Sequence, residues 1–272
     1  MTTEPAEQLE TVTAALLVIG DEILSGRTKD KNIGTIADHL TSIGIRLREV
    51  RVVPDEEEEI IAALNAVRAR YDYVFTTGGI GPTHDDITAD AVAKAFGVSI
   101  DVDERAVNML LERIPRADLT EARLRMARIP AGADLVENSV SKAPGFFIGN
   151  VIVMAGVPRI MEAMLAAVTP RLRTGPKLLS HTINAMIREG DIAPVLSATQ
   201  KAYPDVPMGS YPYEADGRYG ALLVLRSVSA ARLEEAETAL RTGLEAANIP
   251  WADVQPELTQ ARGSDGNWQS PD

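Results

Sequence analysis

The sequence contains no cysteine among its 272 residues. Disulfide bridges, thiolate zinc sites and a cysteine nucleophile are therefore excluded. No apolar run approaches the roughly 18 residues that a membrane-spanning helix requires. Residues 1–7 are polar and acidic, without the basic and apolar pattern of a signal peptide. We therefore expect a protein of the cytoplasm that has no membrane partner.

Basic residues are also scarce relative to acidic ones. The chain has 27 Lys and Arg against 39 Asp and Glu, which gives a net charge of −12. Non-specific binding of nucleic acid depends on basic patches, so we expect no nucleic-acid partner. An acidic chain can still carry a local site for phosphate.

Several motifs of nucleotide binding and hydrolysis are missing. There is no Gly-x₄-Gly-Lys-Ser/Thr loop, no complete Gly-x-Gly-x-x-Gly and no Gly-x-Ser-x-Gly. The three histidines are scattered and give no metal signature. We expect His39 to lie on a helix surface and His181 to be structural. His84 lies in a candidate turn, where it could contact a ligand or act as an acid or base.

The most informative stretch that is present runs from Thr76 to Thr88. It follows an apolar, aromatic strand at 71–75 and precedes a helical pattern at 89–96 that Gly97 closes. Glycines let backbone N–H groups approach a ligand, and a helix N-terminus favours negative charge. This combination predicts a phosphate-binding turn whose candidate residues are Thr77, Gly78, Gly79, Gly81 and Thr83.

Two adjacent carboxylates, Asp85 and Asp86, lie in the same turn. Bare carboxylates repel phosphate, so a phosphate site here requires Mg²⁺ or another divalent metal. The structural alternative is that Asp86 or Thr88 caps the following helix while the glycines turn the chain.

Strands and helices alternate through the first part of the chain. Strands are predicted at 13–19 and 45–53, and helices at 32–43 and 56–70, the second with Asp55 and Glu58 as a capping box. This alternation predicts a mostly parallel, three-layer α/β sheet. Residues 103–128 are expected to form two inserted helices broken near Pro115. Among them, Arg123, Arg125 and Arg128 indicate a solvated face, with an anion-facing role as the alternative.

A boundary is predicted at Gly175–Pro176. Residues 175–250 show the order βαββα, which is typical of a small α+β domain. We therefore expect four segments, namely a flexible lead-in at 1–11, the larger domain at 12–174, the smaller domain at 175–250 and a disordered tail at 251–272.

Polar turns follow three of the predicted strands. They are Gly20-Asp21-Glu22, the stretch around Gly78, and Gly156-Val157-Pro158. In an open parallel sheet these ends share one edge, so their residues can meet in one crevice. The segment Lys142-Ala143-Pro144-Gly145 could enter the same crevice, with Lys142 either facing phosphate or simply solvated.

These motifs resemble the molybdopterin-binding family of molybdenum-cofactor biosynthesis, which includes the MoaB and Mog proteins. The resemblance rests on Gly20–Gly26 followed by Asp30-Lys31-Asn32, on Thr77–Thr88, on Ala143–Phe146 and on Gly156–Pro158. It spans about 12–172 and is greatest to the N-terminal half of the CinA family and to a similar domain of eukaryotic FAD synthases. Residues 175–250 resemble the small module that follows in CinA. No counterpart of the CinA amidase domain is present, so amidase activity is not expected of these residues.

The resemblance implies a three-layer fold that binds a phosphorylated pterin or an adenine nucleotide. Family members adenylylate molybdopterin, whereas CinA-like relatives are associated with metal-dependent hydrolysis of ADP-ribose. Asp86 matches the aspartate of the family's Thr-Gly-Gly motif, and Asp21 matches its Gly-Asp-Glu turn. The resemblance implies that Asp86, Asp85 and His84 take part in catalysis. It also implies that Asp86 and Asp21 bind the metal. Ligand binding falls to Gly20, Asp21, Glu22, Thr77, Gly78, Gly79, Gly81, Thr83, Lys142, Pro144, Gly145 and Gly156.

The leading hypothesis is therefore a CinA-like protein that binds a phosphate ligand with Mg²⁺ or another divalent metal and hydrolyses ADP-ribose. No organic cofactor is required, although molybdopterin is a possible ligand. The alternatives are a non-catalytic ligand sensor or assembly protein, and molybdopterin adenylylation. Relatives form dimers or trimers, so the resemblance also implies a homo-oligomer.

Overall fold

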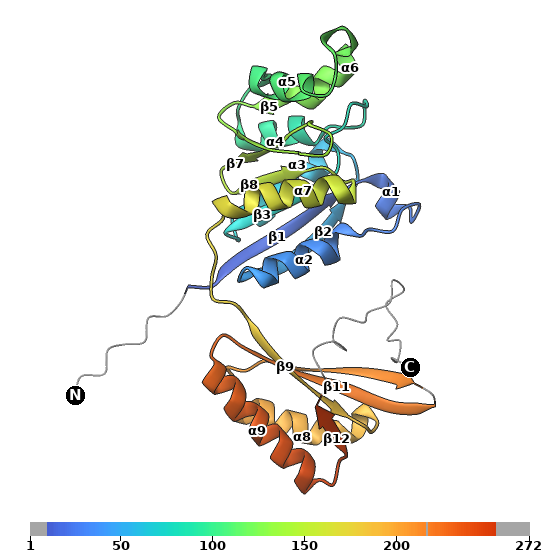
Figure 1. Ribbon diagram of the computed structural model, residues 1–272, viewed down its shortest axis with the longest axis vertical. Helices are drawn as coiled ribbons and strands as arrows, with labels where there is room; N and C mark the ends of the chain where they lie inside the picture. The colour runs from blue at the N-terminus through green and yellow to red at the C-terminus, as the bar shows by residue number, and fades with distance from the viewer. Residues whose placement is uncertain (1–9, 216, 254–272) are drawn as a thin grey trace, which may run out of the picture. The chain divides into compact units, whose positions relative to one another are not determined.

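The computed structural model describes residues 10–215 and 217–253. The chain forms two compact units that divide between Pro176 and Lys177 (Figure 1). Each unit has its own hydrophobic core. No helix among the described residues combines the length and the apolar character needed to cross a membrane.

Unit 1 is built on a six-stranded sheet in the order β2-β1-β3-β8-β7-β6. The first four strands are parallel, and β7 and β6 extend the sheet in antiparallel fashion. Their bounds are Val12–Ile19 for β1, Ile45–Val53 for β2, Tyr73–Thr77 for β3, Asp134–Val136 for β6, Gly145–Ile148 for β7 and Val151–Met154 for β8.

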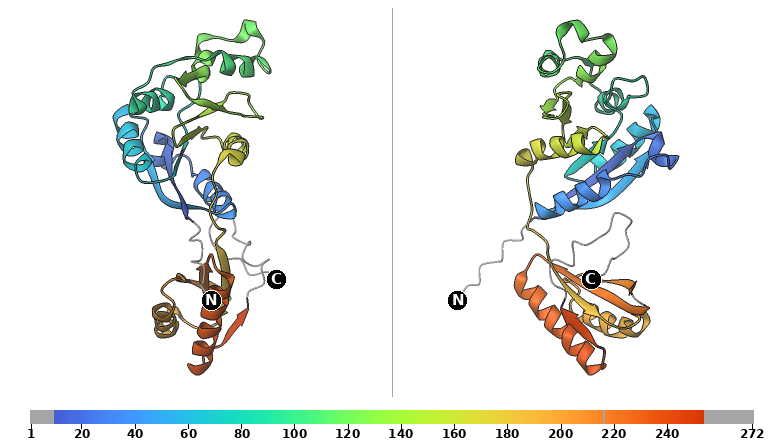
Figure 2. Two further views of the ribbon diagram at one scale, coloured as in Figure 1. Left: turned by 90° about the vertical axis from the view of Figure 1, so that its left-hand side faces the viewer. Right: turned by 45° about the vertical axis from the view of Figure 1, so that its right-hand side comes forward.

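Helices cover both faces of this sheet, because the strands carry apolar side chains on both sides. α2 and α7 pack on one face, and α3 and α4 pack on the other (Figure 2). The α-helices of unit 1 are Asp21–Leu24 for α1, Asn32–Ser42 for α2, Glu57–Arg68 for α3, Thr88–Phe96 for α4, Glu104–Leu111 for α5, Glu121–Leu124 for α6 and Pro158–Val168 for α7. The predicted three-layer, mostly parallel α/β fold is confirmed.

One extra residue interrupts the pairing of β2 with β1. Ala14 faces Leu47 whereas Ala15 faces Glu49, so Arg48 is left over as a bulge. The alternation of side chains changes phase at this point. Ile45 contributes to the core under α2, and Val53 contributes to the core on the opposite face.

The inserted segment after α4 is more irregular than the two predicted helices. Beyond α5 it contains the 3₁₀ turn η1 at Arg116–Asp118, the single-turn helix α6 and the 3₁₀ turn η2 at Arg125–Ala127. A two-stranded antiparallel sheet of β4 (Ile100–Val102) and β5 (Arg128–Pro130) anchors the segment. A further 3₁₀ turn, η3 at Thr169–Arg171, follows α7. The break near Pro115 occurs, but most of the expected second helix is replaced by short turns.

Unit 2 is a four-stranded antiparallel sheet in the order β10-β11-β9-β12 with two helices, α8 and α9. The bounds are Leu179–Ala185 for β9, Glu189–Ala202 for α8, Met208–Ala215 for β10, Arg218–Ser227 for β11, Ala230–Ala246 for α9 and Trp251–Asp253 for β12. The small α+β fold is confirmed. However, the expected tail at 251–272 begins with an ordered strand, because Trp251 pairs with Ala185 of β9. The remainder of that segment, and residues 1–9 of the expected lead-in, lie outside the described residues.

Candidate functional site

The turns after β1, β3 and β8 lie against one another at the carboxyl edge of the sheet. The Gly78 N–H donates to the Met154 carbonyl over 3.2 Å. A Cβ atom on Gly78 would lie 2.1 Å from the Ile19 carbonyl oxygen, and one on Gly156 would lie 3.3 Å from the Gly78 Cα. The structure therefore brings Gly20, Gly78 and Gly156 to one place.

The loop from Gly79 to Thr88 is held in shape by its own side chains. Asp86 Oδ2 accepts hydrogen bonds from the Thr83 N–H at 2.8 Å and from its hydroxyl at 2.5 Å. The Thr88 hydroxyl donates to the Gly78 carbonyl over 3.0 Å. Asp86 Oδ1 accepts no hydrogen bond within the described part of the chain, so one carboxylate oxygen fixes the side chain and the other is available to a ligand.

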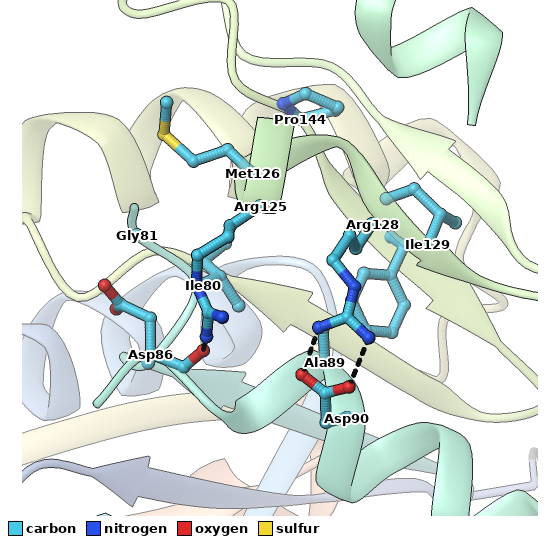
Figure 3. A pocket seen from close by; sticks show the side chains of 12 residues that line it. Ile80, Gly81, Asp86, Ala89, Asp90, Arg125, Met126, Arg128, Ile129 and Pro144 are labelled. Atoms are coloured by element: carbon cyan, nitrogen blue, oxygen red, sulfur yellow. Dashed lines mark hydrogen bonds and ion pairs between the residues drawn. The ribbon is translucent and has the colours of Figure 1, made fainter. Parts of the chain in front are cut away.

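Arg125 ties this loop to the inserted segment (Figure 3). Its Nε donates to the Thr83 carbonyl and its Nη2 to the Asp86 carbonyl, both over 3.1 Å. The Asp86 carboxylate points away from the guanidinium, and Arg125 contacts the Asp86 carbonyl instead. Arg125 therefore positions the backbone that carries Asp86.

Arg128 lies beside Arg125 and forms a two-fold ion pair with Asp90, with both bonds at 2.7 Å. The two arginines line a small pocket under the glycine turn, together with Asp86 and Pro144. Its volume of about 20 Å³ is close to the space that one water needs. The pocket is therefore too small to enclose a pterin or a nucleotide. The expectation of a solvated arginine face is wrong for these two residues, and Arg123 instead donates to the Asp118 carbonyl.

Asp55 belongs to the same edge, although the sequence pattern assigned it to a capping box. α3 begins at Glu57 without a side-chain cap. The Asp55 carboxylate instead accepts the Asp21 N–H over 3.0 Å and joins the turn after β2 to the turn after β1. Burial raises the pKa of Asp55, and the negative charges of Asp21, Glu22 and Asp85 raise it further. Carboxylates from the turns after β1 and β3 therefore act on Asp55 in the turn after β2.

This cluster suits a cation that arrives with a phosphate ligand better than one held by protein alone. Among residues 10–215 and 217–253, no three His, Asp or Glu side chains are arranged to hold a metal ion. Mg²⁺ usually keeps several waters and takes one or two carboxylates together with substrate phosphates. Burial is the main cause of the raised Asp55 pKa, and a cation here would offset the smaller contribution from the neighbouring negative charges.

Asn32 is a further polar residue at this edge. Its side chain is 4% exposed, and its Nδ2 donates to the Gly156 carbonyl over 2.7 Å. This bond joins the start of α2 to the turn after β8. Its Oδ1 is buried without a hydrogen-bond partner among the described residues.

The remaining predicted site residues have different surroundings. Thr77 is buried at the end of β3, and Pro144 and Gly145 are buried at the start of β7. The His84 side chain is 99% exposed, and its Nδ1 lies 3.8 Å from Asp85 Oδ1. Lys142 is paired with Glu112 over 2.5 Å, so its charge is already matched by a carboxylate.

Three residues at this edge were not singled out as site residues from the sequence, namely Asn32, Asp55 and Arg125. Asp55 follows β2 as Asp21 follows β1, so the rule that selects polar groups after strands would have found it. Asn32 belongs to the Asp30-Lys31-Asn32 stretch, which carries part of the family resemblance. No local pattern indicates the contacts of Arg125.

The raised pKa of Asp55 predicts a pH dependence of stability. Because the folded pKa lies above the ordinary value, ionised Asp55 destabilises the fold, and this penalty appears as pH rises through the folded pKa. We expect Asp55→Asn to gain stability relative to wild type between acidic and neutral pH in metal-free buffer. Urea unfolding at a series of pH values measures this difference. A difference that stays constant with pH would contradict the prediction.

Each of the two units matches a known protein family. Residues 15–174 match the model of the probable molybdopterin binding domain, and residues 177–253 match that of the FAD synthase middle domain. A protein of Pyrobaculum calidifontis is 35% identical over 244 residues, which cover 86% of this chain and 93% of the relative. One of Saccharolobus islandicus is 37% identical over 212 residues, covering 73% and 80% respectively.

A solved structure agrees with the assignment of unit 1. The crystal structure of CinA from Thermoplasma acidophilum, described as a protein of unknown function, is 38% identical in sequence, with a TM-score of 0.56. The match covers 60% of this chain and 99% of that one. The resemblance stated from the motifs is confirmed: the chain belongs to the molybdopterin-binding family, in the CinA-like arrangement with a second domain of the FAD synthase middle type.

Proposed function

We propose that unit 1 binds a phosphorylated adenine nucleotide or pterin together with a divalent cation, and that it hydrolyses the pyrophosphate of ADP-ribose. The observation that carries this proposal is the Asp86 carboxylate, whose Oδ2 is held by Thr83 while Oδ1 accepts no hydrogen bond from a described residue, beside the turns that bring Gly20, Gly78 and Gly156 together. A carboxylate oxygen left open at this edge favours a cation, and a cation in turn favours phosphate.

The geometry supports the following division of tasks. Thr83 and Arg125 fix the Asp86 side chain and its backbone, which leaves Oδ1 to hold or orient a ligand atom. Asp21 and Asp55 lie at the neighbouring turns, where they would hold a cation or its waters. When bound, the cation supplies neutralisation of the phosphate oxygens. The ligand's ring system would lie along the open edge, since the pocket below has room for about one water.

The reaction is a hydrolysis that needs no other reactant. A water oxygen bonds to one phosphorus, the bridging P–O bond breaks, and the products are AMP and ribose 5-phosphate with release of protons to solvent. In this proposal Asp86 orients the attacking water or the cation through Oδ1, while Oδ2 is held by Thr83. The His84 side chain is exposed, and its ion-pair contact is the Asp85 carboxylate at 3.8 Å. We therefore assign His84 no step in the reaction.

A hydrolysis assay tests the proposal directly. The full chain is incubated with ADP-ribose and Mg²⁺, Mn²⁺ or Co²⁺, and AMP is measured by chromatography. We expect release of AMP that stops on addition of EDTA. If no metal supports turnover, a thermal-shift series with ADP-ribose and a phosphorylated pterin separates a silent sensor from a wrong ligand, since a true ligand raises the melting temperature.

A further inference from the structure

Unit 2 has an outermost sheet strand, β10, beside an apolar groove. In the order β10-β11-β9-β12, β10 is an outermost strand and pairs only with β11 among the described strands. An unpaired edge strand offers a row of backbone donors and acceptors to another extended segment. The site therefore stands independently of the proposed function.

The pairing register shows which backbone groups of β10 face outward. The Arg226 N–H donates to the Pro207 carbonyl over 3.0 Å, and Pro207 is followed by the pairs Met208 with Leu225 and Gly209 with Val224. In an antiparallel pair, residues alternate between bonding to the partner strand and facing away. Residues 208, 210, 212 and 214 therefore face away from β11. Pro212, which has no N–H, lies at one of these outward positions, as edge strands allow.

Helix α8 covers the first outward group and leaves the next ones open. The Met208 N–H donates to Gln200 Oε1 of α8 over 2.8 Å. Beyond it, Ser210 and Glu214 have outward N–H and carbonyl groups with no such partner in the described residues. A groove of about 500 Å³ runs between α8 and Ser210, with Ile192, Leu196 and Met208 as apolar lining. A cleft of this size can hold one or two side chains.

The groove contains one buried polar atom without a partner in the described part of the chain, on Ser210, and one exposed carbonyl without its helical donor, on Gly190. Ser210 Oγ is buried and has no hydrogen-bond partner among the described residues. Pro194 lies inside α8 and has no N–H to donate to the Gly190 carbonyl, which is four residues earlier and lines the groove. A buried polar group without a partner carries a cost that a bound ligand removes.

The charged residue that lines the groove is acidic, namely Glu189. Asp191 lies in the first turn of α8, and Glu214 lies at an outward position of β10. None of these three forms an ion pair with a described residue. The basic neighbour at the start of α8, Arg188, lies over the Tyr219 ring at 4.9 Å. Two copies of β10 paired antiparallel about Pro212 would bring these acidic groups together and would oppose two prolines without N–H groups. The charge therefore favours a basic partner over a second copy.

We propose that the β10 edge and the α8 groove bind an extended, basic peptide segment of another protein. The peptide adds as a strand to β10 through Ser210 and Glu214, as in other edge-strand recognition. One apolar side chain of the peptide enters the groove beside Leu196, and flanking Lys or Arg side chains face Glu189 and Glu214.

A displayed library of random peptides, selected on the full chain, tests this inference. We expect enriched peptides that combine an apolar residue with Lys or Arg at alternating spacing, and an affinity that falls as salt is raised. Ser210→Pro removes the outward N–H without touching the bonds to β11. This substitution should lower the affinity for the selected peptides by at least about tenfold.

A second pair of variants keeps the test decisive if Ser210→Pro does not fold. Ala193→Trp fills the groove from α8, and it should abolish binding of the selected peptides. Ala198→Trp places the same side chain at an exposed position of α8 outside the groove lining and should leave binding unchanged. Absence of enriched sequences, or equal binding by both tryptophan variants, overturns the proposal. So does a concentration-dependent dimer of the wild-type chain that Ser210→Pro abolishes, because a second copy then occupies the edge.

Discussion

Asp86→Asn is expected to lower the rate of ADP-ribose hydrolysis by at least about 100-fold. The substitution keeps the size of the side chain and an oxygen that can accept from Thr83, so the loop retains one of its bonds. It removes the negative charge that would hold a cation or orient a water through Oδ1. The measurement is the steady-state rate of AMP release at saturating metal.

Asp38→Asn provides a control with the same change in charge. Asp38 lies exposed on α2 and forms no ion pair with a described residue, so its substitution should leave the rate unchanged. Circular dichroism of both variants establishes that the fold survives. If Asp86→Asn hydrolyses ADP-ribose at the wild-type rate, Asp86 only shapes its loop and the assignment of its function is wrong.

Gly78→Ala is expected to lower the free energy of unfolding of unit 1 by about 3 kcal/mol or more. Gly78 has a φ of 103°, a region that L-residues rarely adopt. A Cβ atom there would also lie 2.1 Å from the Ile19 carbonyl oxygen, which is backbone and cannot turn aside. The turn after β1 would have to move away from β3.

Gly97→Ala separates these two causes. Gly97 also has a positive φ, 67°, at the end of α4, but a Cβ atom there meets nothing within 4 Å. Its substitution should lower the free energy of unfolding by about 1 kcal/mol, the cost of placing an L-residue in the left-handed backbone conformation. Urea unfolding followed by far-ultraviolet circular dichroism measures both. Trp251 pairs with Ala185 in unit 2, so the fluorescence that Trp251 contributes should not shift. Equal losses in the two variants would show that the close approach at Gly78 is unimportant.

The parts of the fold that follow from local pattern were predictable. Alternating apolar strands and amphipathic helices indicate a parallel sheet, and polar turns after the strands indicate its functional edge. The strand β12 has only three residues, and Trp251 is held through contacts with Ala185 and with the Arg241 guanidinium. A segment this short has no periodicity of its own, so the polar composition after it dominated the prediction.

The site was harder to predict because its contacts join distant parts of the chain. Asp55 is 34 residues from Asp21, and the bond between them replaced a local capping pattern that the sequence displays just as clearly. Arg125 reaches Thr83 across 42 residues. An arginine that serves two backbone carbonyls has no spacing signature, because carbonyls occur at every residue. Charge alone cannot separate it from the solvated arginines nearby.

The bulge at Arg48 shifts the alternation of side chains along β2 by one residue. Each residue of β2 after the bulge therefore faces the side of the sheet opposite to the one it would face without the bulge. This includes Val53, whose carbonyl accepts the Gly20 N–H, and it affects the position of Asp55 two residues later. Deleting Arg48 would restore uninterrupted alternation and turn the end of β2 by half a turn. The strand would still pair with β1, but its apolar end would face the wrong layer and Asp55 would be displaced from Asp21. Arg48, a residue distant from the glycine turn, thus determines whether the Asp55 carboxylate reaches the Asp21 N–H.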